Sequence, residues 1–446
     1  METDALLPEN NIEKIPIVGI QAAPARFDAL NRLAARVGLD RITQFNTGSF
    51  HQMALNEMYE ELHPEGFPES NIKAYETHRE LVKALGRGAI DMAMIAVDNN
   101  YSGRVGTAID ELRKPENEFR ITGRVTIAVE QHILHHRKHS EADIEHVISQ
   151  KPALDQVAHE KEAQGWTKMI EAKDTVLSAM EVARKKGIIK GKPTAAIASR
   201  VAGEANGLNV GLKVSKEGNA TTFWRITKEK QFYPEENANR LAFTFSTTDH
   251  PGSLYDTVAA VSDLGYDFTD IDCHLAPEDG HRVFFVEVKI PEDRNGVEAL
   301  QELSNVNSEE SGQSNQFKPI GVYADITREE VSDVIRGQDK LAVPDAVNTI
   351  NWSREGSEYE EGSSVVYVDA KNEHGSLKGM LAAFRDRDVN IVDMSRPVST
   401  DGNGSRGFYF VAEPGSDVGE VLSQLELNKY FVTHYKYFQK ELALAA

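Results

Sequence analysis

Cysteine is almost absent from this chain, since Cys273 is the only one in 446 residues. A single cysteine cannot form an intrachain disulfide, which fits a reducing compartment. Long apolar runs are missing too, and no stretch reaches the ~18 residues that a membrane-spanning helix needs. The N-terminal segment is acidic and lacks the basic and apolar regions of a secretory signal. We therefore expect a cytoplasmic protein with no membrane contact.

Basic residues are also few, with 49 lysines and arginines against 70 acidic residues and a formal net charge of −21. Nucleic-acid-binding surfaces need clustered positive charge to contact phosphates, so this balance argues against a nucleic-acid partner. Hydrophobic residues make up 40% of the chain, an ordinary globular composition. The length predicts about three domains and a sizeable core.

Apolar runs alternate with helical patterns up to about Ile226. Strands are predicted at 15–20, 90–97, 124–130, 145–149 and 195–198, and helices at 27–37, 77–86, 153–164 and 175–185. The run at 90–97 is apolar almost throughout, as expected for a strand buried on both faces of a parallel sheet. This alternation predicts an α/β fold with mostly parallel sheets.

After Tyr233 the pattern changes and then repeats. Two successive segments each read as strand, helix, strand, strand, helix, strand, which is the order of a ferredoxin-like βαββαβ unit. Gly252–Ser253–Leu254 in the first recurs as Gly375–Ser376–Leu377 in the second, which indicates an internal duplication. The predicted boundaries are an α/β region at 1–235, a first unit at 236–330, a linker at 331–364, acidic and Gly/Ser-rich over 353–364, and a second unit at 365–446.

The two repeated units resemble ACT domains, which are small-molecule-binding modules of amino-acid metabolism. Each has a Gly-x-Leu turn before its first helix, where glycine lets a ligand approach the backbone and the helix N-terminus offers free N–H groups. Ser395–Arg396–Pro397 resembles part of the Glu-Ser-Arg-Pro segment of phenylalanine-sensing ACT domains. The effector-binding residues that this resemblance implies are Gly252, Ser253, Leu254, Gly375, Ser376, Leu377, Ser395 and Arg396. The alternative is a pair of structural ferredoxin-like units without a ligand.

The region up to about residue 230 resembles the catalytic region of prephenate dehydratases in four places. Asp98–Asn99–Asn100, with Gly103 and Val105, falls on the family's Pro-Ile-Glu-Asn-Ser-x-x-Gly-x-Val. The other three matches are Ser149 with Ala153, Leu154 and Gln156; Ala195–Ala198 with Gly207–Leu208; and Asn219–Phe223 on Asn-x-Thr-Arg-Phe. The resemblance implies a two-lobed catalytic region like a periplasmic binding protein, with the lobes closing on the ligand.

The sequence departs from the family pattern in ways that bear on the substrate. The opening Gly-x-x-Gly-Thr is reduced to Gly19 with Ala22 and Ala23, and Gln150–Lys151 replaces His-Pro. Thr222 replaces the family's arginine, which removes a cation near a doubly anionic substrate. Arg26 or Arg225 could take its place.

Four retained polar residues carry the chemistry that the resemblance implies. Thr221 would protonate the departing hydroxyl of prephenate or a related cyclohexadienyl acid, and Asn99, Ser149 and Gln156 would anchor its polar groups. The remaining substrate contacts would be Gly19, Arg26, Asp98, Asn100, Thr175, Ala196, Asn219, Thr222 and Phe223. Losing CO2 and water makes the ring aromatic, so no metal or organic cofactor is required. Phenylalanine is the implied effector, and a homodimer or homotetramer is the expected assembly.

Each of these residues also has a structural interpretation. Thr221 could be a β-branched strand residue, Ser149 a helix cap, Asn99 a turn residue and Gln156 a solvated helix residue. Arogenate is an alternative substrate, and a non-aromatising prephenate decarboxylase and a non-catalytic amino-acid-binding regulator are alternative functions. The histidines at 132, 135, 136 and 139 could bind a metal ion at helical spacing, but they read better as an exposed polar edge.

Overall fold

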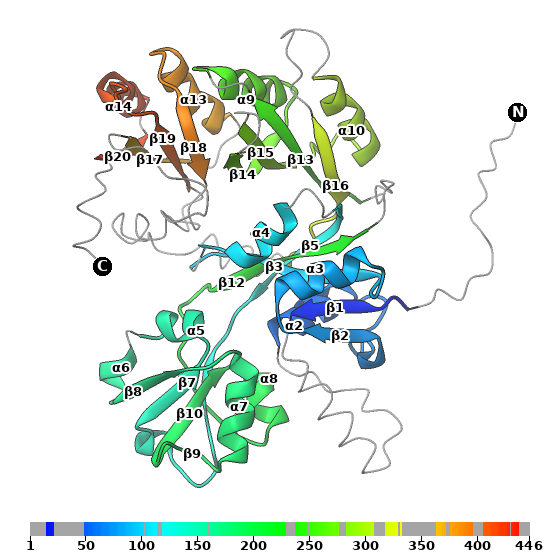
Figure 1. The fold of residues 1–446 in the computed structure, drawn as a ribbon, viewed down its shortest axis with the longest axis vertical. Helices are drawn as coiled ribbons and strands as arrows, with labels where there is room; N and C mark the ends of the chain where they lie inside the picture. Colours follow the sequence, from blue (N-terminus) through cyan, green and yellow to red (C-terminus); the bar gives the residue numbers. More distant parts are fainter. Residues whose placement is uncertain are drawn as a thin grey trace, which may run out of the picture.

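The computed structural model describes residues 15–21, 49–101, 103–113, 118–158, 160–228, 237–247, 250–275, 282–306, 317–328, 331, 363–371, 375–395, 405–428 and 430–436. The predicted helix at 27–37, Arg26, Arg396 and most of the predicted linker lie outside these residues. Figure 1 shows the described parts in three layers along the long axis. Lobe 2 lies at one end, lobe 1 in the middle, and two C-terminal units at the other end.

Lobe 1, in the middle, holds the first predicted strands and helices. Its central strands β1 (Val18–Gln21), β2 (Ile72–Tyr75) and β3 (Met92–Asn99) pair in parallel, as the apolar run at 90–97 predicts. The other elements are α2 (Phe50–Met58), η1 (Glu69–Asn71), α3 (His78–Gly86), β4 (Gly103–Arg104), α4 (Gly106–Arg113), β5 (Arg120–Ala128) and β12 (Ala220–Thr227). β12 lies antiparallel between β3 and β5, so the sheet is mixed.

Lobe 2 is built from the residues between β5 and β12. Its sheet has the order β11-β6-β10-β7-β8, with β9 beside β10. The elements are β6 (His132–His135), η2 (Glu141–Asp143), β7 (His146–Ser149), α5 (Lys151–Gln156), α6 (Glu160–Ala163), β8 (Lys168–Glu171), α7 (Thr175–Arg184), β9 (Ile188–Ile189), β10 (Lys192–Ala198), α8 (Arg200–Ala205) and β11 (Asn209–Lys213).

The single helix predicted at 153–164 is wrong, because the chain forms α5 and α6 with a break between them. Val157 ends α5 and is fully buried in one core cluster with Trp166. Burying both side chains requires the chain to turn at this point, so packing overrides the local helical pattern.

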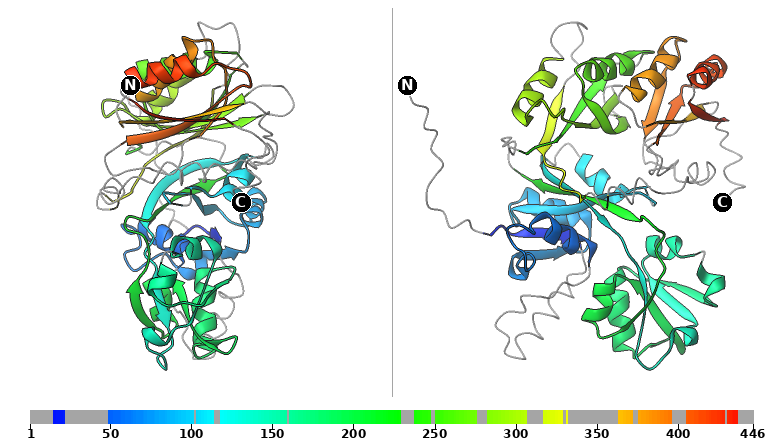
Figure 2. Two further views of the ribbon diagram at one scale, coloured as in Figure 1. Left: turned by 90° about the vertical axis from the view of Figure 1, so that its left-hand side faces the viewer. Right: turned by 180° about the vertical axis from the view of Figure 1, so that it is seen from behind.

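The chain crosses between the lobes twice, after β5 and before β12. At these crossings the Val129 N–H donates to the Asn219 carbonyl at 2.7 Å, and the Val214 N–H donates to the Gln131 carbonyl at 2.9 Å. The two connecting segments therefore run side by side, and Figure 2 shows them as the narrow link between the lobes. A two-lobed region is the architecture that the family resemblance implies.

The two C-terminal units repeat one architecture. The first contains β13 (Arg240–Thr247), α9 (Ser253–Asp263), β14 (Asp267–Leu275), β15 (Arg282–Lys289), α10 (Gly296–Asn305) and β16 (Lys318–Tyr323). The second contains β17 (Ser364–Lys371), α13 (Ser376–Arg385), β18 (Ile391–Ser395), β19 (Ser405–Ala412), α14 (Gly419–Leu427) and β20 (Phe431–Lys436). Read from the outer edge of each unit, the sheet orders are β16-β13-β15-β14 and β20-β17-β19-β18, which correspond strand for strand. The predicted βαββαβ order is therefore present in both.

The two units join edge to edge within one chain. β14 pairs with β18 through Asp272 and Ser395, and α9 packs beside α13. Their apolar residues form a single core cluster. In Figures 1 and 2 the helices cover the outer face of this joint sheet, and the other face turns toward lobe 1.

The first unit also joins lobe 1, through β16 and β5. Gly321 lies opposite Ile121 in this parallel pair, and a Cβ at Gly321 would stand 2.4 Å from the Ile121 carbonyl oxygen. Only glycine permits so close an approach of the two backbones. Through this contact the described strands form one 14-stranded sheet from β2 to β20.

Candidate active site

A cluster of amide side chains and one hydroxyl lies where the two lobes meet. Asn99, at the end of β3, donates from Nδ2 to Asn219 Oδ1 at 2.8 Å and to Thr221 Oγ1 at 2.9 Å. Gln156, at the end of α5, accepts from Asn219 Nδ2 at 2.8 Å and donates to Asn99 Oδ1 at 3.4 Å. We call Asn99, Gln156, Asn219 and Thr221 the amide cluster. The structure thus brings together three of the four predicted catalytic residues.

The cluster depends on elements from both lobes. Asn99 belongs to lobe 1, Gln156 to lobe 2, and Asn219 and Thr221 to the second crossing segment. Asn100 fixes that segment, because its Nδ2 donates to the Gly218 carbonyl at 2.7 Å and its Oδ1 accepts from the Ala220 N–H at 2.8 Å. A change in the angle between the lobes would therefore move Gln156 relative to Asn99.

Thr221 is the hydroxyl of this cluster and is half-buried. A threonine hydroxyl has one proton and two acceptor sites. Because Asn99 donates to Oγ1, the Thr221 proton is directed toward a different acceptor. The arrangement suits a hydroxyl that donates a proton to a bound molecule.

Ser149, the fourth predicted catalytic residue, lies apart from the cluster. Its Oγ donates to the Ile197 carbonyl at 2.7 Å, and the residue is fully buried between β7 and β10. The helix-cap interpretation of Ser149 is wrong, because Gln150 occupies the N-cap position of α5 and the Ser149 hydroxyl bonds within the sheet. In this structure Ser149 stabilises the lobe 2 sheet next to the helix that presents Gln156.

Several predicted substrate contacts lie in the cores of the lobes. Ala196 is fully buried in β10, and Phe223 is buried in lobe 1. Gly19 lies in β1, where a Cβ would come within 2.4 Å of Ile90 Cδ1 and 2.6 Å of Leu81 Cδ1. A larger residue there would displace both side chains, so Gly19 is part of the packing of lobe 1.

Other predicted contacts lie at the edges of the lobes. Thr222 points away from Thr221 along the strand and shares a 2.9 Å hydrogen bond with Thr126. Thr175 is the first residue of α7. Beside it, Lys173 pairs with Glu76 of lobe 1 at 2.7 Å, so an exposed ion pair crosses between the lobes.

Arg225 does not take the place of the family's missing arginine. It donates from Nε to Thr122 Oγ1 at 3.0 Å and from a terminal nitrogen to Tyr59 Oη at 3.3 Å. The alternation of the strand places it four residues from Thr221 on the same face. Its guanidinium therefore binds side chains of lobe 1.

Arg104 is a residue beside the motif that the sequence did not single out. It faces Asp98 across the β3–β4 pair and forms an ion pair with Asp270 of β14. Burial would lower the pKa of Arg104, but Asp270, Asp98 and Asp272 together raise it. A permanently charged arginine thus connects the Asp98–Asn99 segment to the first C-terminal unit.

A second connection to this unit is a buried ionic network around Arg124. Arg124 pairs with Asp325, and its guanidinium lies 3.7 Å from Glu287; Arg240 also contacts Asp325, at 2.9 Å. Tyr323 donates to Glu287 at 2.6 Å. Burial would raise the pKa of both carboxyls, but Arg124 and Arg240 hold the pKa of Asp325 at about 2 and that of Glu287 below its usual value.

The sequence motifs also did not single out two histidines, His51 and His78, that lie close to strand β12. The His51 ring meets the edge of Phe223 at 5.0 Å between centroids and lies 6.5 Å from the ring of His78. Burial, and then the neighbouring His78, lower the pKa of His51 to about 3. His51 is therefore neutral at physiological pH.

We expect the buried His51 to make the protein less stable in mild acid. The pKa of His51 is about 3 in the folded chain and ordinarily 6.5. As the pH falls, this histidine is therefore protonated in the unfolded chain before it is protonated in the folded chain. The stability that it contributes is complete above pH 6.5 and is lost as the pH falls toward 3, by about 1–2 kcal/mol at pH 5. Urea denaturation at pH 7 and pH 5 measures this loss.

The matched variant is H51Q, which fills similar space without titrating. Its stability should fall less than that of the wild type between the two pH values. His78 has a pKa that burial also lowers, and Glu111 opposes the shift, so some loss will remain. An equal loss in both proteins would show that His51 is not the responsible group.

The histidine-rich stretch has a structural role in the described residues. His132 and His135 lie in strand β6, so the helical spacing considered for metal binding is wrong. The His135 ring nitrogen Nδ1 donates to the His139 carbonyl at 2.8 Å. Within the described ranges no three His, Cys, Asp or Glu side chains gather in a way that could hold a metal ion. The same ranges contain no helix with the length and hydropathy to cross a membrane.

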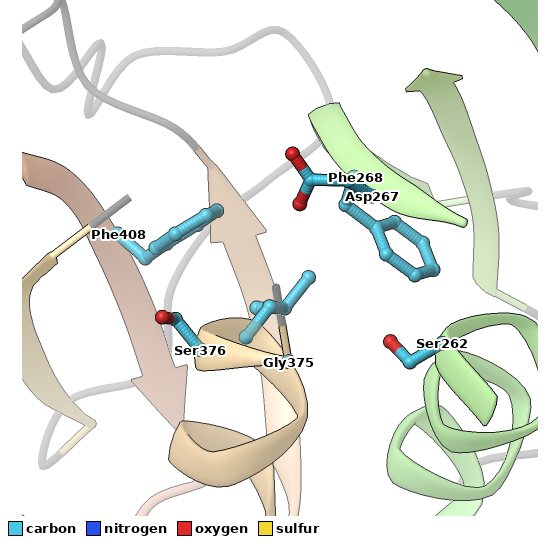
Figure 3. Close-up of a pocket in the computed structure, with 7 residues that line it drawn as sticks. Ser262, Asp267, Phe268, Gly375, Ser376 and Phe408 are labelled. Atoms are coloured by element: carbon cyan, nitrogen blue, oxygen red, sulfur yellow. The ribbon is translucent and has the colours of Figure 1, made fainter. Parts of the chain in front are cut away.

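The seam between the C-terminal units contains two hollows at the predicted effector loops. Gly252 and Gly375 each precede a helix with positive φ angles of 87° and 82°, which glycine adopts without strain. Figure 3 shows the hollow beside Gly375, into which the rings of Phe268 and Phe408 and the hydroxyl of Ser262 point. The other hollow lies beside Gly252, at the opposite end of the seam.

Comparison with known proteins finds similarity over the region that holds the two lobes. Residues 44–231 match the family model described as prephenate dehydratase. Two relatives are prephenate dehydratases of Lactococcus lactis, from subspecies lactis and cremoris, each 23% identical. They align over 54% and 50% of this chain and over 86% and 80% of their own lengths. The chain is thus similar to prephenate dehydratases over residues 44–231.

Two solved structures share the fold over 69% of the chain. One, a prephenate dehydratase in complex with L-Phe from Arthrobacter aurescens, has a TM-score of 0.53 at 17% identity over 90% of its length. The other is described as GqqA, a novel type of quorum quenching acylase, with a TM-score of 0.52 at 22% identity over 97% of its length. The lobes end at residue 228, so the shared fold reaches into the C-terminal units.

Proposed function

We propose that this chain converts prephenate to phenylpyruvate by decarboxylative dehydration. The observation that carries the proposal is the hydrogen bond that the Thr221 hydroxyl accepts from Asn99, which directs the hydroxyl proton toward another acceptor. The family match over residues 44–231 includes every member of the amide cluster. An arrangement of neutral amides around one hydroxyl suits a reaction that needs one proton donor and fixed geometry.

Apart from one proton, which solvent supplies, the chemistry requires no other reactant. The bond between the ring and the carboxylate breaks, and its electron pair becomes a ring π bond as the hydroxyl at the opposite carbon leaves. Thr221 gives its proton to that hydroxyl, which departs as water, and solvent reprotonates the threonine oxygen. The products are CO2, water and phenylpyruvate, and aromatisation supplies the driving force.

The other cluster residues position Thr221 and the substrate. Asn99 holds the Thr221 oxygen and is itself held by Gln156 and Asn219. Because Gln156 comes from lobe 2, the proton donor is correctly placed only when the lobes have their present relation. Ser149 does not contact the cluster itself. Its hydrogen bond to the Ile197 carbonyl stabilises the sheet beside α5, the helix that presents Gln156.

We also propose that the two C-terminal units are ACT domains that bind phenylalanine and control the reaction. Support comes from the two glycine loops in the seam and from the shared βαββαβ architecture. The Arthrobacter aurescens prephenate dehydratase of similar fold was solved with L-Phe bound. Arg104 and Arg124 provide direct contacts through which the first unit reaches lobe 1.

The test is to incubate the purified full chain with prephenate and identify the product. Formation of phenylpyruvate supports the proposal, and inhibition or activation by phenylalanine supports the regulatory part. Release of CO2 with the ring hydroxyl retained would replace it with a non-aromatising decarboxylase. Turnover of arogenate in preference to prephenate would change the substrate and keep the mechanism. Binding of phenylalanine without turnover of either compound would leave a non-catalytic sensor.

A further inference from the structure

An extra residue interrupts the pairing of β3 with β12 just before the amide cluster. Thr222 lies opposite Asp98, but the next residue, Phe223, lies opposite Ala96. Val97 is therefore one residue more than β12 has at this point, which makes it a β-bulge. Bulges turn the side chains that follow them to a different face of the strand and are common beside active sites.

The bulge decides which way Asn99 faces. Val97 is buried in the core cluster that contains Ile95, and strict alternation would place Asn99, two residues on, on that same face. Instead Asn99 lies opposite Thr221 and donates to its hydroxyl. Thr221 shares its face with Phe223, which packs against α2 in a different core cluster. Without the extra residue, Asn99 would point away from the proposed proton donor.

Asp98 takes the opposite direction and meets Arg104. It lies between Thr222 of β12 and Arg104 of β4, and residues directly opposite each other in antiparallel strands share a face. On this face Arg104 forms its ion pair with Asp270 of β14, in the first C-terminal unit. The two side chains are only 20% and 14% exposed, so water and salt screen this pair less than a surface ion pair.

The segment that carries Arg104 also holds the bulge itself. The N–H of the next residue, Val105, donates to the Val97 carbonyl at 3.0 Å. Asp98 and two aspartates of β14 attract the Arg104 guanidinium and together raise its pKa. Like charges repel one another, so removing the arginine would push Asp98 away from β14. Arg104 thus holds Asp98 in place directly behind Asn99.

We infer that Arg104 is a positioning residue, which holds the bulge that turns Asn99 toward Thr221. The inference rests on the proposed function and adds a residue that acts through Asn99 rather than on the substrate. Because Asp270 is the other partner of Arg104, the bulge is held only while β14 lies against lobe 1. Loss of that contact slows the proton transfer from Thr221.

A double-mutant cycle, measured by steady-state kinetics with prephenate, tests this inference. R104M should lower kcat at least about tenfold, because small displacements of a positioned group cost that much or more. In a T221A background the same substitution should change kcat by less than about twofold, since no hydroxyl remains to be positioned. A merely structural defect would lower kcat alike in both backgrounds. R104K keeps the charge and should recover part of the rate.

R294M is the matched control for the loss of a half-buried, paired arginine. The Arg294 side chain is 24% exposed and pairs at 2.9 Å with Glu302, inside the first unit. This variant should keep the kcat of the wild type. D270N is a milder change than R104M and should lower kcat several-fold in the Thr221 background only. It keeps the test decisive if R104M fails to fold, which a thermal melt of each variant checks.

Hydrogen exchange provides a readout that needs no turnover. The N–H groups of Asn100 and Val105 donate to carbonyls on either side of the bulge, those of Ala220 and Val97. Peptides that cover them should exchange faster in R104M than in the wild type, and at the wild-type rate in R294M.

The outcomes separate the inference from the function on which it rests. Normal kcat in folded R104M, an equal loss with and without the Thr221 hydroxyl, or unchanged exchange would overturn the inference and leave the proposed reaction intact. No turnover of prephenate by the wild type would remove the proposed reaction. Hydrogen exchange would then decide whether Arg104 holds the bulge behind Asn99.

Discussion

Replacing Thr221 with alanine is expected to lower kcat for prephenate by about 10²–10⁴-fold, the usual contribution of a positioned general acid. KM should change by no more than a few-fold, because the three amides of the cluster remain to hold the substrate. Only the proton donor is lost. Steady-state kinetics that follow phenylpyruvate formation measure both constants.

Two further variants control for effects on the strand itself. T221S keeps the hydroxyl and should recover much of the lost rate. T227A makes the same change on the same face of β12, six residues away and outside the amide cluster, and should leave kcat close to that of the wild type. A T221A enzyme with normal kcat would mean that the proton comes from another group, and the assignment of Thr221 would be wrong.

Replacing Arg124 with methionine is expected to destabilise the junction between lobe 1 and the first unit by about 3 kcal/mol, as found for buried ion pairs that lose one partner. Glu287 and Asp325 are 3% and 9% exposed, so removing the cation leaves two carboxylates nearly out of water. Arg240 still contacts Asp325 and limits the loss. Urea denaturation followed by tryptophan fluorescence measures the loss, and Trp224 lies at this junction, 5.2 Å from the Phe285 ring.

The pH dependence gives this prediction a second signature. Asp325, with a folded pKa of about 2 against its ordinary 3.8, contributes stability that is complete above pH 3.8 and is lost as the pH falls toward 2. In R124M that contribution shrinks, so the gap between the two proteins should narrow in acid. K151M is the control, since its pair with Asp155 is exposed to solvent and its loss should change the stability little. Equal effects of the two substitutions would contradict the buried network.

Much of the fold follows from local pattern. The strand at 90–97, the helix at 77–86 and both βαββαβ successions are present close to their predicted bounds. The local pattern could not predict which strands pair at the edges of the separate sheets. The pairing of β14 with β18 and the contact of Gly321 with Ile121 bring together residues about 120 and 200 positions apart, and neither carries a local signal.

Part of the candidate site could likewise be predicted from the sequence, and part could not. Motif order found Asn99, Gln156, Asn219 and Thr221, which hydrogen bonds then join. It could not show that Ser149 points into the lobe 2 sheet, because facing depends on register. Arg104 and His51 were missed because an arginine or a histidine outside a motif looks like any surface residue until burial and its partners are known.

The edge-to-edge joining of the two C-terminal units within one chain has a consequence for how the protein responds to its own concentration. A seam formed between separate subunits opens on dilution, and any site in it weakens as the subunits part. Here a covalent connection holds the partners of β14 and β18 at a high effective concentration whatever the amount of protein. The seam, and whatever it binds, should behave the same in a scarce protein as in an abundant one.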